Sequence, residues 1–237
     1  LQSVNAEKDI YIFSAFSDTQ PIIYYLINTK KNTLQQLGRS YPSLINKPLA
    51  TMKEITYSAR DGLEIPALLT LPNANAPSKL PLIVYPHGGP WAHDEWGFNP
   101  WVQYFASRNY AVLQPQYRGS TGYGIKHEEA GYKKWGAEMQ DDITDGILHL
   151  IDKGIVDKSR VCIVGASYGG YAAAWGLVKT PDLYRCGISI NGVLSLTKNA
   201  AEIENYLRQI GNVQFAGAMS EQMNTLGGIF SNIQDNF

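Results

Sequence analysis

The chain has 237 residues, of which 44% are hydrophobic, a size and composition that suit one well-packed domain with part of a second. Lysine and arginine total 20 and aspartate and glutamate 21, so the net charge of −1 gives no positive field for nucleic acid. No stretch approaches the ~20 apolar residues of a membrane span, and no signal-peptide pattern opens the sequence. We expect neither nucleic-acid nor membrane partners, and the cytoplasm is slightly favoured over the periplasm or secretion.

The N-terminal residues have the pattern of β structure. Two runs of β-branched and aromatic residues, separated by a polar turn, predict a β-hairpin over residues 10–27. Pro42 and Pro48 then interrupt the pattern and indicate a linker. This places a domain boundary between residues 1–48 and residues 49–237.

Beyond the linker, short apolar strands alternate with helices after a further hairpin over residues 54–71. The helix signal is clearest at 141–153, where Asp141 and Asp142 suit the positive end of a helix dipole and Gly154 ends the pattern. The alternation predicts an α/β fold with a mostly parallel sheet covered by helices on both faces. The other expected elements are strands at 80–85, 110–113, 160–164 and 186–190, and helices at 101–107 and 168–179.

A Gly-x-Ser-x-Gly sequence at 165–169 carries the chemistry. It lies directly between an expected strand and an expected helix, which is the context of a nucleophile elbow. So tight a turn requires small flanking residues, and this is met by Gly165, Ala166, Gly169 and Gly170. We therefore predict Ser167 as the nucleophile, with the backbone N–H of Tyr168 directed at the reaction centre.

A second glycine-containing loop, Pro-His-Gly-Gly-Pro at 86–90, follows the strand that ends at Tyr85. In folds with a nucleophile elbow, the loop after an earlier strand supplies the second oxyanion-binding N–H. Two consecutive glycines let the backbone approach a substrate carbonyl closely. We predict the N–H of Gly89 for this role, with that of Gly88 as the alternative.

The order of these motifs resembles the prolyl oligopeptidase family, most of all its acylaminoacyl-peptidase and dipeptidyl-aminopeptidase branches. The motifs are Tyr-Pro-His-Gly-Gly-Pro at 85–90, Tyr-Arg-Gly-Ser-Thr-Gly-Tyr-Gly at 117–124, Asp-Asp at 141–142 and Gly-Ala-Ser-Tyr-Gly-Gly-Tyr at 165–171. The resemblance covers roughly residues 50–195 and implies an α/β-hydrolase that acts on short peptides, with Ser167 as nucleophile and the backbone N–H groups of Tyr168 and Gly89 as oxyanion donors. By the same resemblance, residues 1–45 correspond to the last strands of a β-propeller.

The sequence lacks the rest of a catalytic triad. In this fold the order is serine, then an acidic residue, then histidine, yet every histidine precedes Ser167: His87, His93, His127 and His149. We assign none of them as the base. His87 is expected to order the oxyanion loop, His149 to be solvent-exposed on its helix, and the other two to lie in loops. Asp182 and Asp235 lie in unsuitable contexts for the acid.

We interpret the chain as a fragment cut at both ends, with an α/β-hydrolase domain incomplete at its C-terminal side. A serine without a base is a weak nucleophile, so the fragment alone should have little or no activity although its parent is a serine peptidase. The strand at 186–190 should form an exposed apolar edge, partly covered by a helix at 201–210. Such an edge would lead the fragment to aggregate or form a homo-oligomer.

Two other functions stay open. A carboxylesterase would use the same fold, and a hydrolase-like binding domain without catalysis would explain the missing histidine. A propeller upstream of residue 1 would favour the peptidase. Cys162 and Cys186 lie in apolar runs and are expected to be free buried thiols. No metal-ligand spacing is present, and no cofactor or metal is expected.

Overall fold

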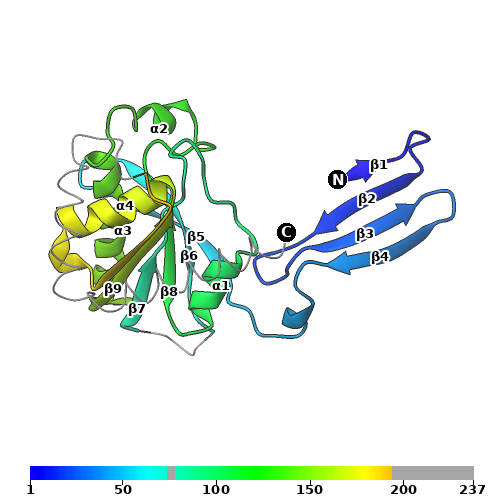
Figure 1. The fold of residues 1–237 in the computed structure, drawn as a ribbon, viewed down its shortest axis with the longest axis horizontal. Helices are drawn as coiled ribbons and strands as arrows, with labels where there is room; N and C mark the ends of the chain where they lie inside the picture. Colours follow the sequence, from blue (N-terminus) through cyan, green and yellow to red (C-terminus); the bar gives the residue numbers. More distant parts are fainter. Residues whose placement is uncertain (74–77, 194–237) are drawn as a thin grey trace, which may run out of the picture. The chain divides into compact units, whose positions relative to one another are not determined.

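Two β-sheets of different pattern follow one another along the chain (Figure 1). The computed structural model describes residues 1–73 and 78–193. The first sheet is antiparallel, in the order β1 (Ser3–Val4), β2 (Ile10–Ala15), β3 (Ile23–Asn28) and β4 (Thr33–Arg39). The pairing of β2 with β3 confirms the predicted hairpin. The sequence did not indicate β4 because most of its side chains are exposed and many are polar, so no alternation marks it.

The second sheet has six strands and a mixed pattern. Its order is β10-β9-β7-β8-β6-β5, and its strands are β5 (Met52–Ser58), β6 (Glu64–Thr70), β7 (Leu80–Val84), β8 (Ala111–Pro115), β9 (Val156–Ala166) and β10 (Cys186–Ile190). The pairs among β7, β8, β9 and β10 are parallel. The hairpin strands β5 and β6 are antiparallel to each other, and the pairing of β6 with β8 is also antiparallel.

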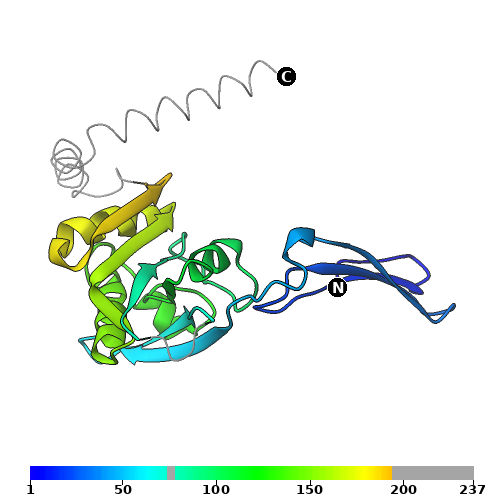
Figure 2. The same cartoon turned by 90° about the horizontal axis from the view of Figure 1, so that it is seen from below.

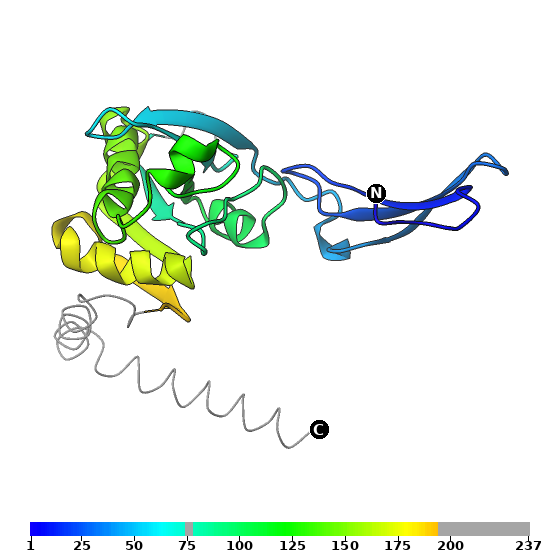
Figure 3. The same cartoon turned by 90° about the horizontal axis from the view of Figure 1, so that it is seen from above.

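Helices cover this sheet on both faces. They are α1 (Pro100–Ala106), α2 (Ile125–Glu129), α3 (Glu138–Asp152) and α4 (Tyr168–Lys179), with short 3₁₀ turns at Pro42–Leu44 and Pro181–Leu183. The helices α3 and α4 lie side by side on one face (Figure 3), and α1 lies on the other (Figure 1). None of these helices has the length and hydropathy that a membrane crossing requires within the described ranges.

Alternation along the strands divides the core between the two faces. On β8, Val112 packs in the cluster that includes Val102 of α1, and its neighbour Leu113 must therefore point to the α3 side. Both residues are fully buried. The predicted two-faced α/β arrangement is therefore confirmed.

Helix α3 begins three residues earlier than expected, and this changes the interpretation of its acidic residues. Glu138 and Asp141 occupy the first turn. Asp142 lies one residue further on, beyond the first turn, and is fully buried, so the prediction that it complements the start of the helix dipole was wrong. Its carboxylate instead receives hydrogen bonds from Arg118, as described below.

The two cysteines form a disulfide, which corrects the prediction of free thiols. Cys162 on β9 and Cys186 on β10 are direct partners in the parallel register, with their Cα atoms 4.7 Å apart. Partnered residues on adjacent strands place their side chains on the same face of the sheet. The sequence could not show this because it gives the two strands without their register.

Strand β10 is the last strand on its side of the sheet in the described part of the chain (Figure 2). Ile188 on this strand is 50% exposed, which agrees with the expected apolar edge. The helix predicted at 201–210 lies outside the described residues.

Candidate active site

Ser167 occupies a strained turn between β9 and α4. Its backbone has φ 54° and ψ −120°, a conformation that residues with a side chain rarely adopt. The turn is held by hydrogen bonds from the Ser167 N–H to the carbonyl of Ile190 (3.0 Å) and from the Tyr171 N–H to the Ser167 carbonyl (3.1 Å). The Ser167 side chain is exposed and its hydroxyl has no hydrogen-bond partner among the described residues. This is the geometry of a nucleophile elbow.

Glycines around the turn are required by contact between backbones. A Cβ at Gly165 would overlap the backbone of Gly169, and a Cβ at Gly169 would overlap the carbonyl oxygen of Pro86. The second contact shows that the elbow and the 86–90 loop touch each other directly. The predicted reason for the small residues is therefore correct, and it extends to the neighbouring loop.

The 86–90 loop brings backbone N–H groups to Ser167. A Cβ built on Gly88 would lie 3.4 Å from the Cβ of Ser167, so the loop passes against the nucleophile. Gly89 has φ 127°, which favours glycine, and it precedes a cis proline. Within the described residues, the N–H groups of Gly88 and Gly89 donate to no other group. These unpaired donors beside an exposed hydroxyl can bind an oxyanion.

The side chain of His87 holds this loop in place through hydrogen bonds. Its Nδ1 lies 2.7 Å from the Gly88 carbonyl, and its Nε2 lies 2.8 Å from the Ser120 hydroxyl. The Tyr117 ring stacks on the imidazole, with centroids 4.4 Å apart, and its hydroxyl donates to the His87 carbonyl at 2.8 Å. Burial lowers the pKa of His87 to about 4, so the ring is neutral at pH 7. Both nitrogens are engaged, which agrees with an ordering role and leaves neither free to act as a base.

The other histidines also have structural contacts. His93 is paired with the Thr121 hydroxyl (3.0 Å), in a loop as expected. His127 lies in α2 rather than in a loop. It is buried, and its Nε2 lies 2.9 Å from the Gln116 carbonyl.

His149 is half-buried against the Tyr57 ring rather than solvent-exposed, because α3 packs on β5 at this point. Burial lowers its pKa. None of them is hydrogen-bonded to Ser167 in the described part of the chain.

A buried arginine, which the sequence did not single out, anchors the segment that supports His87. Arg118 donates to both carboxylate oxygens of Asp142, at 2.7 and 2.8 Å, and its guanidinium also binds Asp61, at 2.7 and 3.0 Å. The bond to Arg118 lowers the pKa of Asp61 to about 2. Because Arg118 follows Tyr117 directly, this ion-paired cluster fixes the residue that stacks on His87.

The residue after the nucleophile belongs to a cluster of aromatic rings. The Tyr168 ring is buried and lies 5.6 Å from that of Tyr117 and 5.2 Å from that of Trp135. Trp91, 52% exposed, continues the cluster at 5.9 Å from Trp135. Burial raises the pKa of the Tyr168 hydroxyl, which stays protonated. The Tyr168 ring is therefore part of an aromatic cluster that reaches the surface at Trp91.

Comparison with known proteins identifies this arrangement. Residues 96–224 match the prolyl oligopeptidase family. The chain belongs to this family. Dipeptidyl aminopeptidase BIII of Pseudoxanthomonas mexicana is 36% identical over 193 residues, which cover 78% of this chain and 28% of that protein. Dipeptidyl peptidase family member 6 of Caenorhabditis elegans is 31% identical over 226 residues, 86% of this chain and 30% of that protein.

Solved structures give the same fold. A puromycin hydrolase superposes with a TM-score of 0.70 at 28% identity, over 83% of this chain and 30% of that one. An acylaminoacyl peptidase of Pyrococcus horikoshii superposes with a TM-score of 0.65 at 29% identity, over 78% of this chain and 30% of that one. The six-stranded sheet and its helices are thus the α/β-hydrolase fold of prolyl oligopeptidase relatives. The chain spans less than a third of the length of the relatives that it matches.

Proposed function

We propose that the protein containing this chain is a serine peptidase that cleaves short peptides through an acyl-enzyme on Ser167. One observation carries the proposal: an exposed serine in a strained elbow lies against the 86–90 loop, whose Gly88 and Gly89 N–H groups donate to no other group of the described residues. A hydrolase-like domain without catalysis has no need for backbone strain at Ser167, which is costly to maintain.

The proposed reaction follows from these groups. The Ser167 oxygen attacks the carbonyl carbon of the scissile bond, and a base takes the hydroxyl proton. The N–H groups of Tyr168 and Gly89 donate to the oxygen that becomes negative. The C–N bond then breaks, the amine leaves with the proton, and water hydrolyses the remaining ester. We infer that the histidine base and its carboxylate partner come from outside the 237 residues, because His87 and the other three histidines have structural contacts.

We also propose that the chain contains parts of two domains. Residues 1–48 would be the end of a β-propeller-like domain, and residues 49–237 part of the catalytic domain. The four-stranded antiparallel sheet β1–β4 supports this division, since each strand pairs only with its neighbours in sequence. A propeller over the catalytic domain would restrict the substrates to short peptides.

A fluorophosphonate probe tests the proposal, since it labels only activated serines. The full-length protein should be labelled and should hydrolyse peptide p-nitroanilides, whereas Ser167→Ala should lose both properties and the exposed-serine control Ser159→Ala should keep them. Residues 1–237 alone should be labelled far more slowly, because removing one triad member costs several orders of magnitude in rate. Cleavage of p-nitrophenyl esters without peptides would favour a carboxylesterase. Absence of labelling in the full-length protein would favour a binding domain.

The disulfide bears on the compartment. We propose that the protein works in an oxidising compartment rather than in the cytoplasm that the sequence slightly favoured, because structural disulfides are rare where thiols are kept reduced. When the denatured, unreduced protein is alkylated and analysed by mass spectrometry, Cys162 and Cys186 should remain unmodified, and both should be modified after reduction. Free thiols at both positions would contradict this proposal.

A further inference from the structure

The segment that follows the oxyanion loop is contacted by the N-terminal sheet. We name residues 91–99, between the loop and α1, the bridging segment. A Cβ at Gly97 would lie 3.2 Å from the ring of Phe16, which follows β2, so the two are in contact. The ring of Phe98 lies 5.1 Å from that of Tyr41, which follows β4. The far end of the bridging segment is therefore covered by residues of the first sheet.

A buried carboxylate lies at the centre of this junction. Asp18, in the turn between β2 and β3, is only 8% exposed. Its Oδ2 accepts a hydrogen bond from the Met52 N–H at 2.8 Å, and its Oδ1 accepts one from Thr19 at 2.9 Å. No lysine or arginine of the described residues pairs with it. A buried polar group costs free energy unless it is hydrogen-bonded, so these contacts fix the turn to the start of β5.

The same contacts continue to the bridging segment and to α1. The Met52 carbonyl accepts a hydrogen bond from the Trp96 indole at 3.1 Å. The buried side chain of Gln103 on α1 donates to the Asp18 carbonyl (3.1 Å) and to the Ala50 carbonyl (2.8 Å). The turn that carries Asp18 is thus linked to both the middle and the end of the segment that leads from the oxyanion loop.

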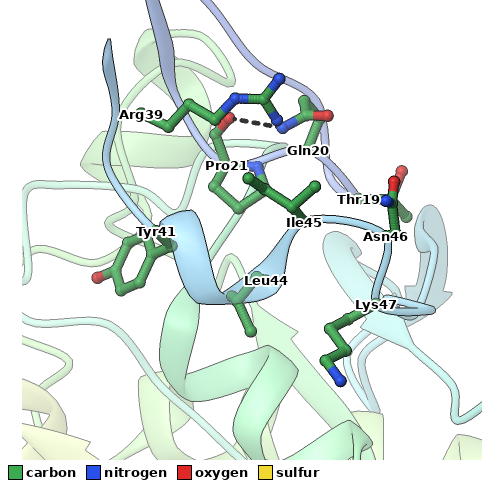
Figure 4. Close-up of a pocket in the computed structure, with 9 residues that line it drawn as sticks. All are labelled: Thr19, Gln20, Pro21, Arg39, Tyr41, Leu44, Ile45, Asn46 and Lys47. Carbon is green, nitrogen blue, oxygen red and sulfur yellow. Dashed lines mark hydrogen bonds between the residues drawn. The ribbon is translucent and has the colours of Figure 1, made fainter.

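The turn that carries Asp18 and the linker are not packed closely against each other. A cavity of about 210 Å³ separates the β2–β3 turn from the 3₁₀ turn of the linker (Figure 4). Its lining includes Thr19 and Gln20 on one side and Leu44 and Ile45 on the other. The near end of the bridging segment is fixed separately, because the Ala92 carbonyl accepts from the Thr121 N–H at 2.9 Å.

We propose that Asp18 is a positioning residue for the oxyanion loop: by holding Met52, and through it Trp96, it sets the path of the bridging segment together with the bond at Ala92, and thereby contributes to the place of the Gly88 and Gly89 N–H groups. This inference rests on the proposed peptidase function. It assigns the N-terminal sheet a part in the chemical step as well as in access to the site.

The test compares Asp18→Ala and Asp18→Asn with an exposed-aspartate control, Asp182→Ala, in the full-length protein. Asp18→Ala should lower kcat on a peptide p-nitroanilide about tenfold, since small misplacements of positioned groups cost about that much or more. KM should change by less than about twofold, because the lost interaction serves the transition state. Asp18→Asn, which retains one acceptor oxygen, should have an intermediate effect.

Amide hydrogen exchange supplies the readout that does not depend on activity. In Asp18→Ala, exchange should rise in residues 86–99 and stay unchanged in α4. Unchanged kcat and unchanged exchange in Asp18→Ala would overturn the proposal. It would also be overturned if exchange rose throughout the six-stranded sheet and the loss of kcat equalled the fraction of the variant that is unfolded. If the wild-type protein cleaves no peptide, the proposed function fails, and the exchange of 86–99 alone decides whether Asp18 positions the loop.

Discussion

The nucleophile elbow and the oxyanion loop are in direct contact in the candidate site, but they are held by different means. The elbow is held by close contacts between backbone atoms at Gly165 and Gly169, where no side chain fits. The oxyanion loop is held by side chains, chiefly Tyr117 and His87, through hydrogen bonds and ring stacking. The elbow therefore tolerates no added atom, whereas the position of the oxyanion loop can be changed in small steps by substituting the side chains that hold it.

The largest effect should come from adding one methyl group to the elbow. In Gly169→Ala the new Cβ would overlap the Pro86 carbonyl, so the elbow and the oxyanion loop must separate. We expect loss of fluorophosphonate labelling and a destabilisation of about 3 kcal/mol, the upper range for overpacking. Gly38→Ala on β4 is the control, because nothing lies within 4 Å of its Cβ. Normal labelling of Gly169→Ala would show that the two halves are not in fixed contact.

A smaller effect should follow from loosening the oxyanion loop. Tyr117→Phe keeps the stacked ring but leaves the His87 carbonyl without its 2.8 Å donor, which should cost about 2 kcal/mol for a buried group. We expect lower kcat with KM nearly unchanged, measured by steady-state kinetics. Tyr11→Phe removes a hydroxyl from an exposed bond and should behave as wild type. Equal changes in the two variants would mean that the loop does not depend on Tyr117.

The smallest effect should be a pH dependence of stability. Burial holds the pKa of His87 at about 4 in the folded state, against an ordinary value of 6.5. The unfolded chain therefore binds the proton first, and stability falls as the pH drops from 6.5 towards 4. At pH 5.5 this group should lower the free energy of unfolding by about 1 kcal/mol relative to pH 7.5.

Denaturant unfolding of the wild type and His87→Gln at both pH values checks this prediction. Asp94 acts in the opposite direction in an overlapping range, because burial raises its pKa to about 6. The informative quantity is therefore the difference between the two proteins. If the variant shows the same pH dependence as the wild type, His87 is not the responsible group.

The sequence predicted the features that depend on neighbouring residues. Ser167 and its glycines could be assigned because the tight turn requires small residues at fixed positions within a sequence of five. The features that it did not predict join distant residues. Arg118 and Asp142 are 24 positions apart, and the Asp18 carbonyl and Gln103 are 85 apart. Their partnership depends on the register and packing of the sheets, which periodicity does not contain.

The disulfide between β9 and β10 has a further consequence for the unfolded chain. Its cysteines are separated by 24 positions, and the ring that they close contains Ser167 and all of α4. Closing a loop of this length removes conformational entropy from the unfolded ensemble worth about 3.5 kcal/mol. The nucleophile therefore lies within a covalently closed loop. The disulfide keeps β9 and β10 close to each other even when the rest of the sheet has unfolded.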